Sequence, residues 1–246
     1  MANYAKSLIT LFVLLLPLQV TAFSLNSVQK VTDAINSNMH YLSLDEFHDI
    51  SRFPEKLSEF TSLEIISANG NNISDISVLQ QMKSLRFLSM NYTEIKDISP
   101  LAQLTTLQRV DLKGTKVTDI RPLNGLQNLL SLSLYATKVT DLTSLASLTQ
   151  LESLNLGYTK ATDISVLKPL INLRSLNILW MPLTDFSVLS QFSLLQHLDV
   201  SYSNFNDFEL LLDLKHLKSL SIEMSKITET KILDPLVEKG LKINYR

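Results

Sequence analysis

Residues 107–128 read LQRVDLKGTKVTDIRPLNGLQN, and residues 129–150 read LLSLSLYATKVTDLTSLASLTQ. The two stretches align without a gap, and each begins with leucine. That leucine recurs every 22 residues, at 63, 85, 107, 129, 151, 173, 195 and 217. A fixed period of this length predicts a solenoid in which each unit stacks on the next.

Seven apolar columns run through these units, and their spacing predicts the shape of one coil. If the leucine is counted as position one, apolar residues occupy positions 1, 4, 6, 11, 14, 17 and 20. Positions four and six share one face of a short strand, because side chains alternate along a strand. The later spacing of three indicates a 3₁₀ or α turn. We therefore expect a strand, a bend, a helical turn and a return in each unit.

The pattern LxxLxLxxTxVxDIxPLxxLxx resembles the 22-residue leucine-rich repeat of the bacterial internalins and of the phosphatase-1 regulatory-subunit class. The resemblance implies an α/β repeat solenoid, a leucine-rich-repeat horseshoe with a parallel β concave wall and short 3₁₀/α turns on the convex wall. It also implies a scaffold that reads partners at outward strand positions three, five and seven.

Position nine departs from the family pattern. The usual asparagine occurs only at Asn71, and threonine or serine replaces it in most other coils. Their hydroxyl groups can still bond the backbone of the turn. Met181 cannot, so we expect an irregular coil there, in which Leu179, Trp180, Met181 and Pro182 follow one another in a bend that faces solvent.

The chain divides into four segments. Residues 1–22 read as a signal peptide, with Lys6, an apolar run from Leu8 to Leu16 and a small-residue ending at Ala22. That run is too short for a membrane span, which needs about 20 residues, so no stable span is expected after cleavage. Residues 23–62 are expected to form an N-terminal cap and degenerate first coil, 63–238 eight repeats, and 239–246 a C-terminal cap strand. Lids are required because a terminal coil exposes its apolar edge.

Composition excludes several classes of function. The formal net charge is -2, so no broad basic field attracts nucleic acid. The chain has no cysteine and only five glycines, which removes thiolate zinc sites and disfavours phosphate-binding loops. No cofactor is expected.

Aspartate recurs at position 13 of seven repeats, from Asp75 to Asp207. Carboxylates one coil apart could suggest calcium. Aspartate just before Ile-x-x-Leu is better placed to cap the helical turn, by accepting from amides two or three residues on. We therefore predict no metal site.

No catalytic arrangement is predicted. The four histidines are scattered, and His197 beside Asp199 forms no hydroxyl-histidine-acid set that the sequence supports. The chain is expected not to be an enzyme.

Candidate partner-binding residues lie at the outward positions and in the following bend. Positions seven and eight are rich in aromatic side chains, which give large contact area at low entropic cost. The same side chains could instead pack between coils, and the sequence leaves both interpretations open. Arg109, Asp111 and Lys113 form a mixed-charge cluster on one strand, which is either a solvated face or a polar rim contact. The predicted site is Tyr135, Tyr158, Leu179, Trp180, Tyr202, Arg109 and Asp111.

These observations predict an exported, monomeric bacterial scaffold, secreted or periplasmic, that binds a protein partner through its concave face. A host-interaction or virulence-related role would follow from the internalin resemblance. The alternatives are a glycan-binding surface protein and an intracellular phosphatase-targeting subunit.

Overall fold

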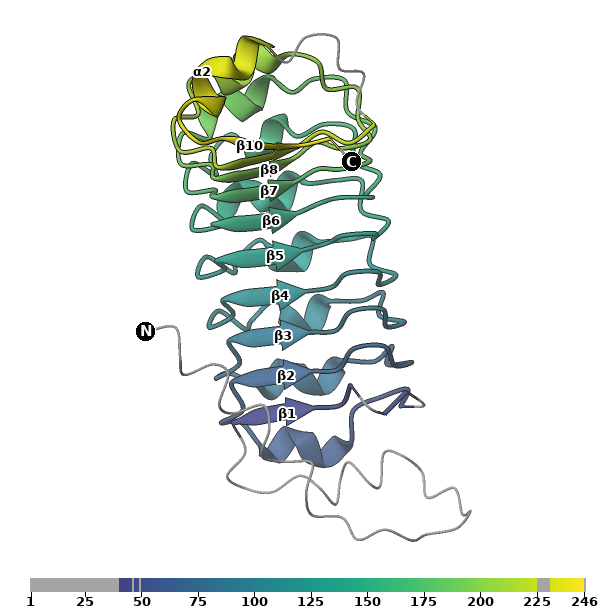
Figure 1. The fold of residues 1–246 in the computed structure, drawn as a ribbon. Coiled ribbons are helices and arrows are strands. Elements are labelled where there is room, and N and C mark those ends of the chain that lie inside the picture. The colour runs from purple at the N-terminus through teal and green to yellow at the C-terminus, as the bar shows by residue number, and fades with distance from the viewer. Residues whose placement is uncertain (1–39, 46, 49, 225–230, 246) are drawn as a thin grey trace, which may run out of the picture.

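The computed structural model describes residues 40–45, 47–48, 50–224 and 231–245. Within them, ten short strands form one open sheet in chain order, and every pairing is parallel (Figure 1). This confirms the predicted fold class. The strands are β1 Tyr41–Ser43, β2 Ile65–Ser67, β3 Phe87–Ser89, β4 Arg109–Asp111, β5 Ser131–Ser133, β6 Ser153–Asn155, β7 Ser175–Asn177, β8 His197–Asp199, β9 Ser219–Ser221 and β10 Lys242–Asn244.

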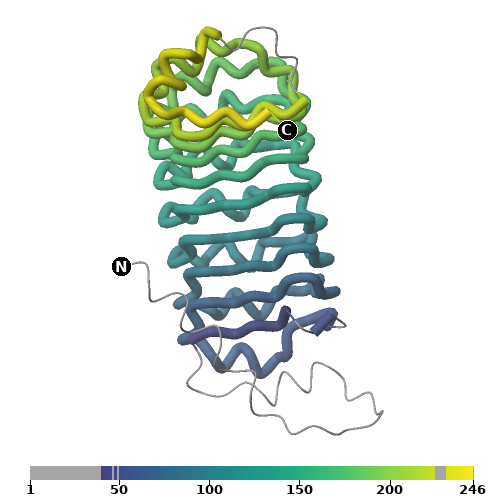
Figure 2. Tube along the Cα trace, in the orientation of Figure 1, coloured from purple at the N-terminus to yellow at the C-terminus, as the bar shows by residue number. Residues whose placement is uncertain are grey.

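Short helical turns form the opposite wall and return the chain to the next strand (Figure 2). In the part of the chain that the structure describes, all but one of them are 3₁₀ turns, as the spacing of three predicts. They are η1 Glu55–Glu59, η2 Ser77–Gln81, η3 Ser99–Leu101, η4 Arg121–Leu123, η5 Thr143–Ser147, η6 Ser165–Leu167, η7 Ser187–Gln191, η8 Phe208–Leu211, η9 Lys231–Leu233 and the α-helix α2 Asp234–Val237.

The sheet register follows the repeat from β2 to β9, so equivalent positions face each other across every pair. The end strands differ: β1 pairs Tyr41 with Ile65, and β10 pairs Lys242 with Ser219. The predicted signal peptide lies outside the described residues, and so do residues 23–39, 46 and 49 of the predicted N-terminal cap. Among the described residues, no helix is long and apolar enough to span a bilayer.

The seven apolar columns form one continuous core between the two walls. In the coil that starts at Leu107, each column residue is at most 2% exposed. Position nine also points inward, although it is polar in most coils. Thr93, Thr115 and Thr137 are buried there, and each hydroxyl donates to the backbone carbonyl three residues earlier. The expected replacement of asparagine by a hydroxyl group is therefore confirmed in these coils.

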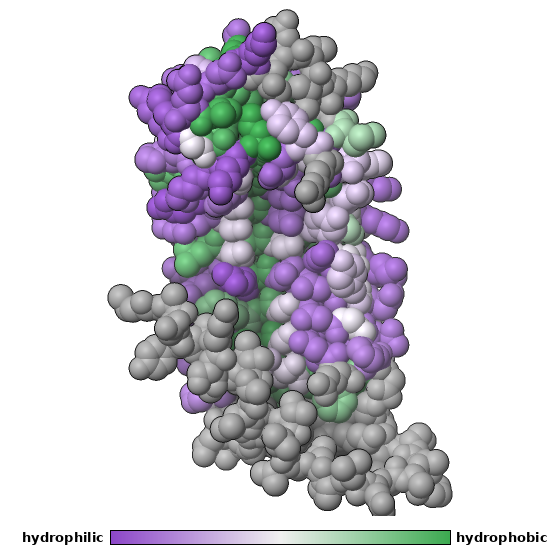
Figure 3. Space-filling view, in the orientation of Figure 1, coloured by the Kyte–Doolittle hydropathy of each residue, from purple (hydrophilic) through white to green (hydrophobic). Residues whose placement is uncertain are grey.

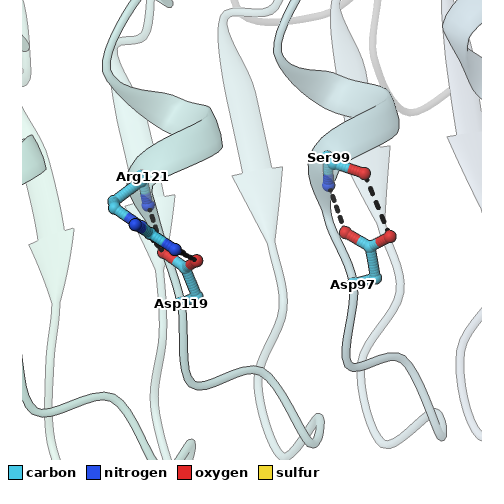
Figure 4. A network of polar contacts seen from close by, with 4 residues as sticks. All are labelled: Asp97, Ser99, Asp119 and Arg121. Carbon is cyan, nitrogen blue, oxygen red and sulfur yellow. Dashed lines mark hydrogen bonds and ion pairs between the residues drawn. The ribbon is translucent and has the colours of Figure 1, made fainter.

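The aspartate column caps the 3₁₀ turns. Asp97 accepts from the Ser99 amide at 2.8 Å, and Asp119 accepts from the Arg121 amide at 2.9 Å and pairs with the Arg121 guanidinium (Figure 4). The same hydrogen bond, from the backbone amide two residues on, recurs in the coils of Asp75, Asp141, Asp163 and Asp185. The predicted capping role is thus confirmed for six coils. Asp207 differs, because η8 begins one residue earlier and no side-chain cap forms.

Candidate functional site

Four aromatic rings form a continuous row where the chain leaves the strands, and we call this row the aromatic ladder. Its members come from four successive coils and are Tyr135, Tyr158, Trp180 and Tyr202. Ring centroids are 5.3 Å apart between Tyr135 and Tyr158, 5.4 Å between Tyr158 and Trp180, and 5.1 Å between Trp180 and Tyr202. Trp180 is 52% exposed and Tyr158 40%, so the ladder packs against itself and faces solvent at once.

The ladder rests on an unusual backbone conformation at position eight. Tyr158, Trp180 and Tyr202 have φ of 57°, 54° and 55°, in the left-handed region that costs a residue with a Cβ roughly 1–2 kcal/mol. The turn requires it, because the position-eight amide donates to the next coil: Tyr158 N–H to the Leu179 carbonyl, and Trp180 N–H to the Ser201 carbonyl, both at 2.9 Å. Strain of this kind gathers at functional sites.

A lysine extends the ladder toward the N-terminal coils. The Lys113 ammonium lies 4.9 Å from the ring centroid of Tyr135 and 5.3 Å from that of Tyr92. Such contacts stabilise a cation by about 0.5–1 kcal/mol at an exposed site. Hydrogen bonding to Tyr92 raises the pKa of Lys113, so the ammonium is charged at neutral pH. Neither Lys113 nor Tyr92 is among the predicted site residues.

The small polar side chains of the sheet face are engaged in hydrogen bonds with the neighbouring backbone. Asn69 Oδ1 accepts from the amide of Asn91 at 2.7 Å, and Asn91 Oδ1 accepts from the amide of Lys113 at 3.0 Å. In later coils Asn155 and Asn177 accept from the amides two residues on. These amides belong to position seven, beyond the hydrogen bonds that pair the strands, so they need another acceptor. Small polar side chains recur on the sheet face because they supply that acceptor. Part of the sheet face therefore stabilises the turn.

Arg109 and Asp111 lie apart from most of the ladder. They occupy β4, whereas Tyr158, Trp180 and Tyr202 follow β6, β7 and β8. Asp111 accepts from the Asn91 amide group at 3.1 Å and from the Lys113 backbone at 3.3 Å. The predicted mixed-charge cluster is therefore divided. Asp111 bonds to Asn91 and to the Lys113 backbone, whereas the Lys113 ammonium contacts the tyrosine rings.

Known proteins share this architecture. A family model described as leucine rich repeats (2 copies) matches residues 61–103. An internalin (inlF) of Listeria monocytogenes is 30% identical with a TM-score of 0.66, over 79% of this chain and 64% of that chain. Internalin C2 of the same species is 24% identical with a TM-score of 0.73, over 82% and 91%. The chain is a leucine-rich-repeat scaffold that resembles the internalins.

The extent of each likeness differs. The chain spans 64% of the length of the first internalin and 57% of a leucine-rich-repeat protein of Leptospira interrogans, which is 22% identical over 80% of this chain with a TM-score of 0.69. The neighbours below 25% identity share the fold alone. A comparison with curated protein sequences gave no match.

The bend at residues 179–182 differs from its prediction. The sequence suggests that Leu179, Trp180, Met181 and Pro182 all face solvent. Met181 is only 3% exposed, because position nine points into the core. The coil keeps the same turn with an apolar side chain in place of the hydroxyl. Leu179 is half-buried beside Gly157, which leaves Trp180 and Pro182 as the exposed pair.

The titratable groups elsewhere on the sheet face are also paired. His197 Nδ1 lies 2.8 Å from Ser219 Oγ, and Asp199 accepts from the Asn177 amide group and the Ser201 backbone. His197 and Asp199 therefore have separate partners. Among the described residues, no group of three His, Asp or Glu side chains is arranged to hold a metal ion.

The sheet face is uneven in polarity. Figure 3 views it directly and shows a narrow green seam that runs across the strands, along the stack of coils, between columns of pale and purple residues. The floor beside the ladder consists of Ser131, Ser133, Ser153, Asn155, Ser175 and Asn177 on β5 to β7. This region has no charged side chain in its strands and is flanked by large rings on one side.

Proposed function

We propose that the chain is an exported bacterial scaffold that binds a protein partner through its sheet face, with the aromatic ladder as the main contact. The observation that carries the proposal is the exposed row of rings on strained backbone beside a floor of small side chains. Exposed aromatic side chains held rigidly are the residues that dominate protein interfaces. A leucine-rich-repeat plant peptide hormone receptor, RGFR1, is known in complex with RGF2 and shares this fold with a TM-score of 0.61.

The ring geometry favours a protein over a glycan. A sugar stacks on an open ring face, whereas the faces of Tyr158 and Trp180 lie against each other with an interplanar angle of 9°. Their edges, and the hydroxyl of Tyr158, remain available to a protein surface. Binding rather than chemistry is therefore proposed for the ladder.

Affinity capture from bacterial envelope and host-cell extracts tests the proposal. The bait chain is compared with a Tyr158→Gly, Trp180→Gly variant and with an Ile171→Ser, Leu212→Ser control. The control residues are exposed apolar side chains that follow η6 and η8. A protein captured by bait and control but lost with the ladder variant supports the proposal. Equal capture by all three baits, or binding on a glycan array without any protein partner, would contradict it.

Export is a second part of the proposal. The charged start, the short apolar run and the ending at Ala22 support cleavage before Phe23. Intact mass of material from the periplasm or medium should begin at that residue. A cytosolic pool that retains residues 1–22 would favour the phosphatase-targeting alternative. A host-interaction or virulence-related role is the natural use of an exported scaffold that resembles the internalins.

A further inference from the structure

Four lysines occur in the turns that follow β4 to β6. Lys113 follows β4 at position seven, and position ten carries Lys116, Lys138 and Lys160 in three successive coils. The last three are exposed, whereas the residues on either side of each are buried. Position ten therefore faces solvent, two residues after the exposed position eight. Lys138 and Lys160 thus belong to the same turns as Tyr135 and Tyr158, and they form a row of cations along three coils with Lys116.

Little negative charge in the described structure opposes these cations. Lys116 Nζ lies 3.7 Å from Glu94 Oε1. Lys138 and Lys160 have no ion pair within 4.0 Å among the residues that the structure describes. Lys113 contacts two tyrosine rings. The row thus has unpaired positive charge in an otherwise nearly neutral chain.

The acidic groups of the same coils are committed elsewhere. Asp119 pairs with Arg121, while Asp141 accepts from the Thr143 amide and Asp163 from the Ser165 amide. These bonds hold the three carboxylates toward the 3₁₀ turns. Glu152 pairs with Arg174, and of the acidic groups that the structure describes in these coils only Asp111 acts on one of the four lysines, because its charge helps to raise the pKa of Lys113. At the far end of the sheet the sign reverses, with Asp199 on β8 and Glu223 after β9. The cationic half of the ladder is therefore confined to the coils of β4 to β6.

We propose that this half of the ladder receives an acidic, extended segment of the protein partner. Its carboxylates would meet Lys138 and Lys160, and its intervening residues would lie against Tyr135 and Tyr158. Neighbouring coils are about 4.8 Å apart at the strands, and like-facing side chains of an extended peptide repeat about every 6.7 Å. Three successive coils therefore span about 9.6 Å, and the long lysine side chains can reach carboxylates that are about 6.7 Å apart in a Glu-x-Glu pattern. The inference rests on the proposed protein-binding function and specifies the chemistry of the partner.

A fluorescence anisotropy titration tests it with a defined probe. The probe is a dye-labelled peptide Glu-Gly-Glu-Gly-Glu-Gly-Glu, and the uncharged comparison replaces each Glu with Gln. The Lys138→Ser, Lys160→Ser variant is compared with a Lys168→Ser, Lys215→Ser control. Both variants remove the same charge, but Lys168 and Lys215 are exposed after η6 and η8, away from the ladder. Circular dichroism checks that each variant is folded.

The acidic peptide should bind the parent chain and the control equally. Its Kd should rise about fivefold to tenfold in the Lys138→Ser, Lys160→Ser variant, as expected for two exposed ion pairs. Raising the salt from about 50 to about 200 mM should weaken binding in the same way. Equal loss in both variants, equal binding of the Gln peptide, or no binding of the acidic peptide overturns the inference. Those results leave the protein capture described above intact, so the two proposals fail separately.

Discussion

The indole of Trp180 lies parallel to the phenol ring of Tyr158, with centroids 5.4 Å apart and planes inclined by 9°. The two residues are 22 apart in the chain and hold the same position in consecutive coils. Each also has a left-handed backbone, so the repeat places both the rings and the strain in register. This relationship connects the stability of the turn with the proposed binding surface.

Glycine should stabilise the turn at position eight where no ring is lost. Ala136 has φ of 55° and carries no ring. Ala136→Gly removes the left-handed penalty and should raise the free energy of unfolding by up to about 1 kcal/mol, because the gain is partly offset by greater chain entropy when unfolded. Thermal and urea melts measure the change. A clear loss of stability would contradict the strain that the backbone implies.

Adding one methyl group at Gly114 should disturb the ladder extension. A Cβ at this residue would clash with Tyr92 Cδ1, and the φ of 67° already disfavours a side chain. Gly114→Ala should cost about 1–3 kcal/mol of stability and move the Tyr92 ring away from Lys113. Gly125→Ala is the matched control, since the nearest atom to its Cβ would be 4.0 Å away. Similar melting of both variants would show that the Tyr92 ring does not constrain residue 114.

Acid should destabilise the turns through the capping carboxylates. Bonds from Arg121 lower the pKa of Asp119 to about 2, and backbone amides lower the pKa of Asp141 and Asp163. A lowered folded-state pKa gives stability that is present above the ordinary value of 3.8 and lost as the pH falls toward 2. The melting temperature should therefore drop in this window.

A variant that keeps the acceptor without the charge isolates this effect. Asp141→Asn with Asp163→Asn can still accept the two amides but no longer titrates. Its melting temperature should fall less steeply below pH 3.8 than that of the parent. If the two slopes are equal, the capping carboxylates do not govern acid stability.

Removal of a whole coil should be tolerated better than removal of a lid. Deletion of residues 129–150 joins Asn128 to Leu151 in the same register, and each coil contacts its neighbours. The shortened chain should stay soluble and melt cooperatively. Deletion of residues 23–62 should cause aggregation, because it uncovers the apolar edge of the next coil. Light scattering and circular dichroism compare the two, and a soluble, cooperative chain without 23–62 would refute the lid assignment.

The strands, the 3₁₀ turns and the caps could be predicted because each depends on a residue type that repeats in every coil. The leucine columns give the core, and the aspartate column gives the caps. The left-handed turn at position eight could not be predicted in the same way. Glycine, the residue that signals it, stands there only at Gly70 and Gly114.

The site was only partly predictable, because contacts between coils depend on side-chain direction. Tyr135 stands at position seven and Tyr158 at position eight, yet their rings meet. Lys113 reaches two tyrosines from different coils, and only the position-seven column hints at this. Met181 was placed wrongly, since an apolar residue at position nine looks exposed until the inward direction of Thr137 and Thr159 is known.

The central claim is that the aromatic ladder binds a protein partner. Once capture has supplied that partner, calorimetry with the Tyr158→Gly, Trp180→Gly variant is the most direct test. Glycine suits the φ of both positions, so the circular dichroism spectrum should not change. Binding should weaken by about 2–4 kcal/mol, as truncation of interface hot spots does, and Ile171→Ser, Leu212→Ser should bind normally. If the ladder variant binds as the parent does but melts far lower, the rings serve packing between coils and the account is wrong.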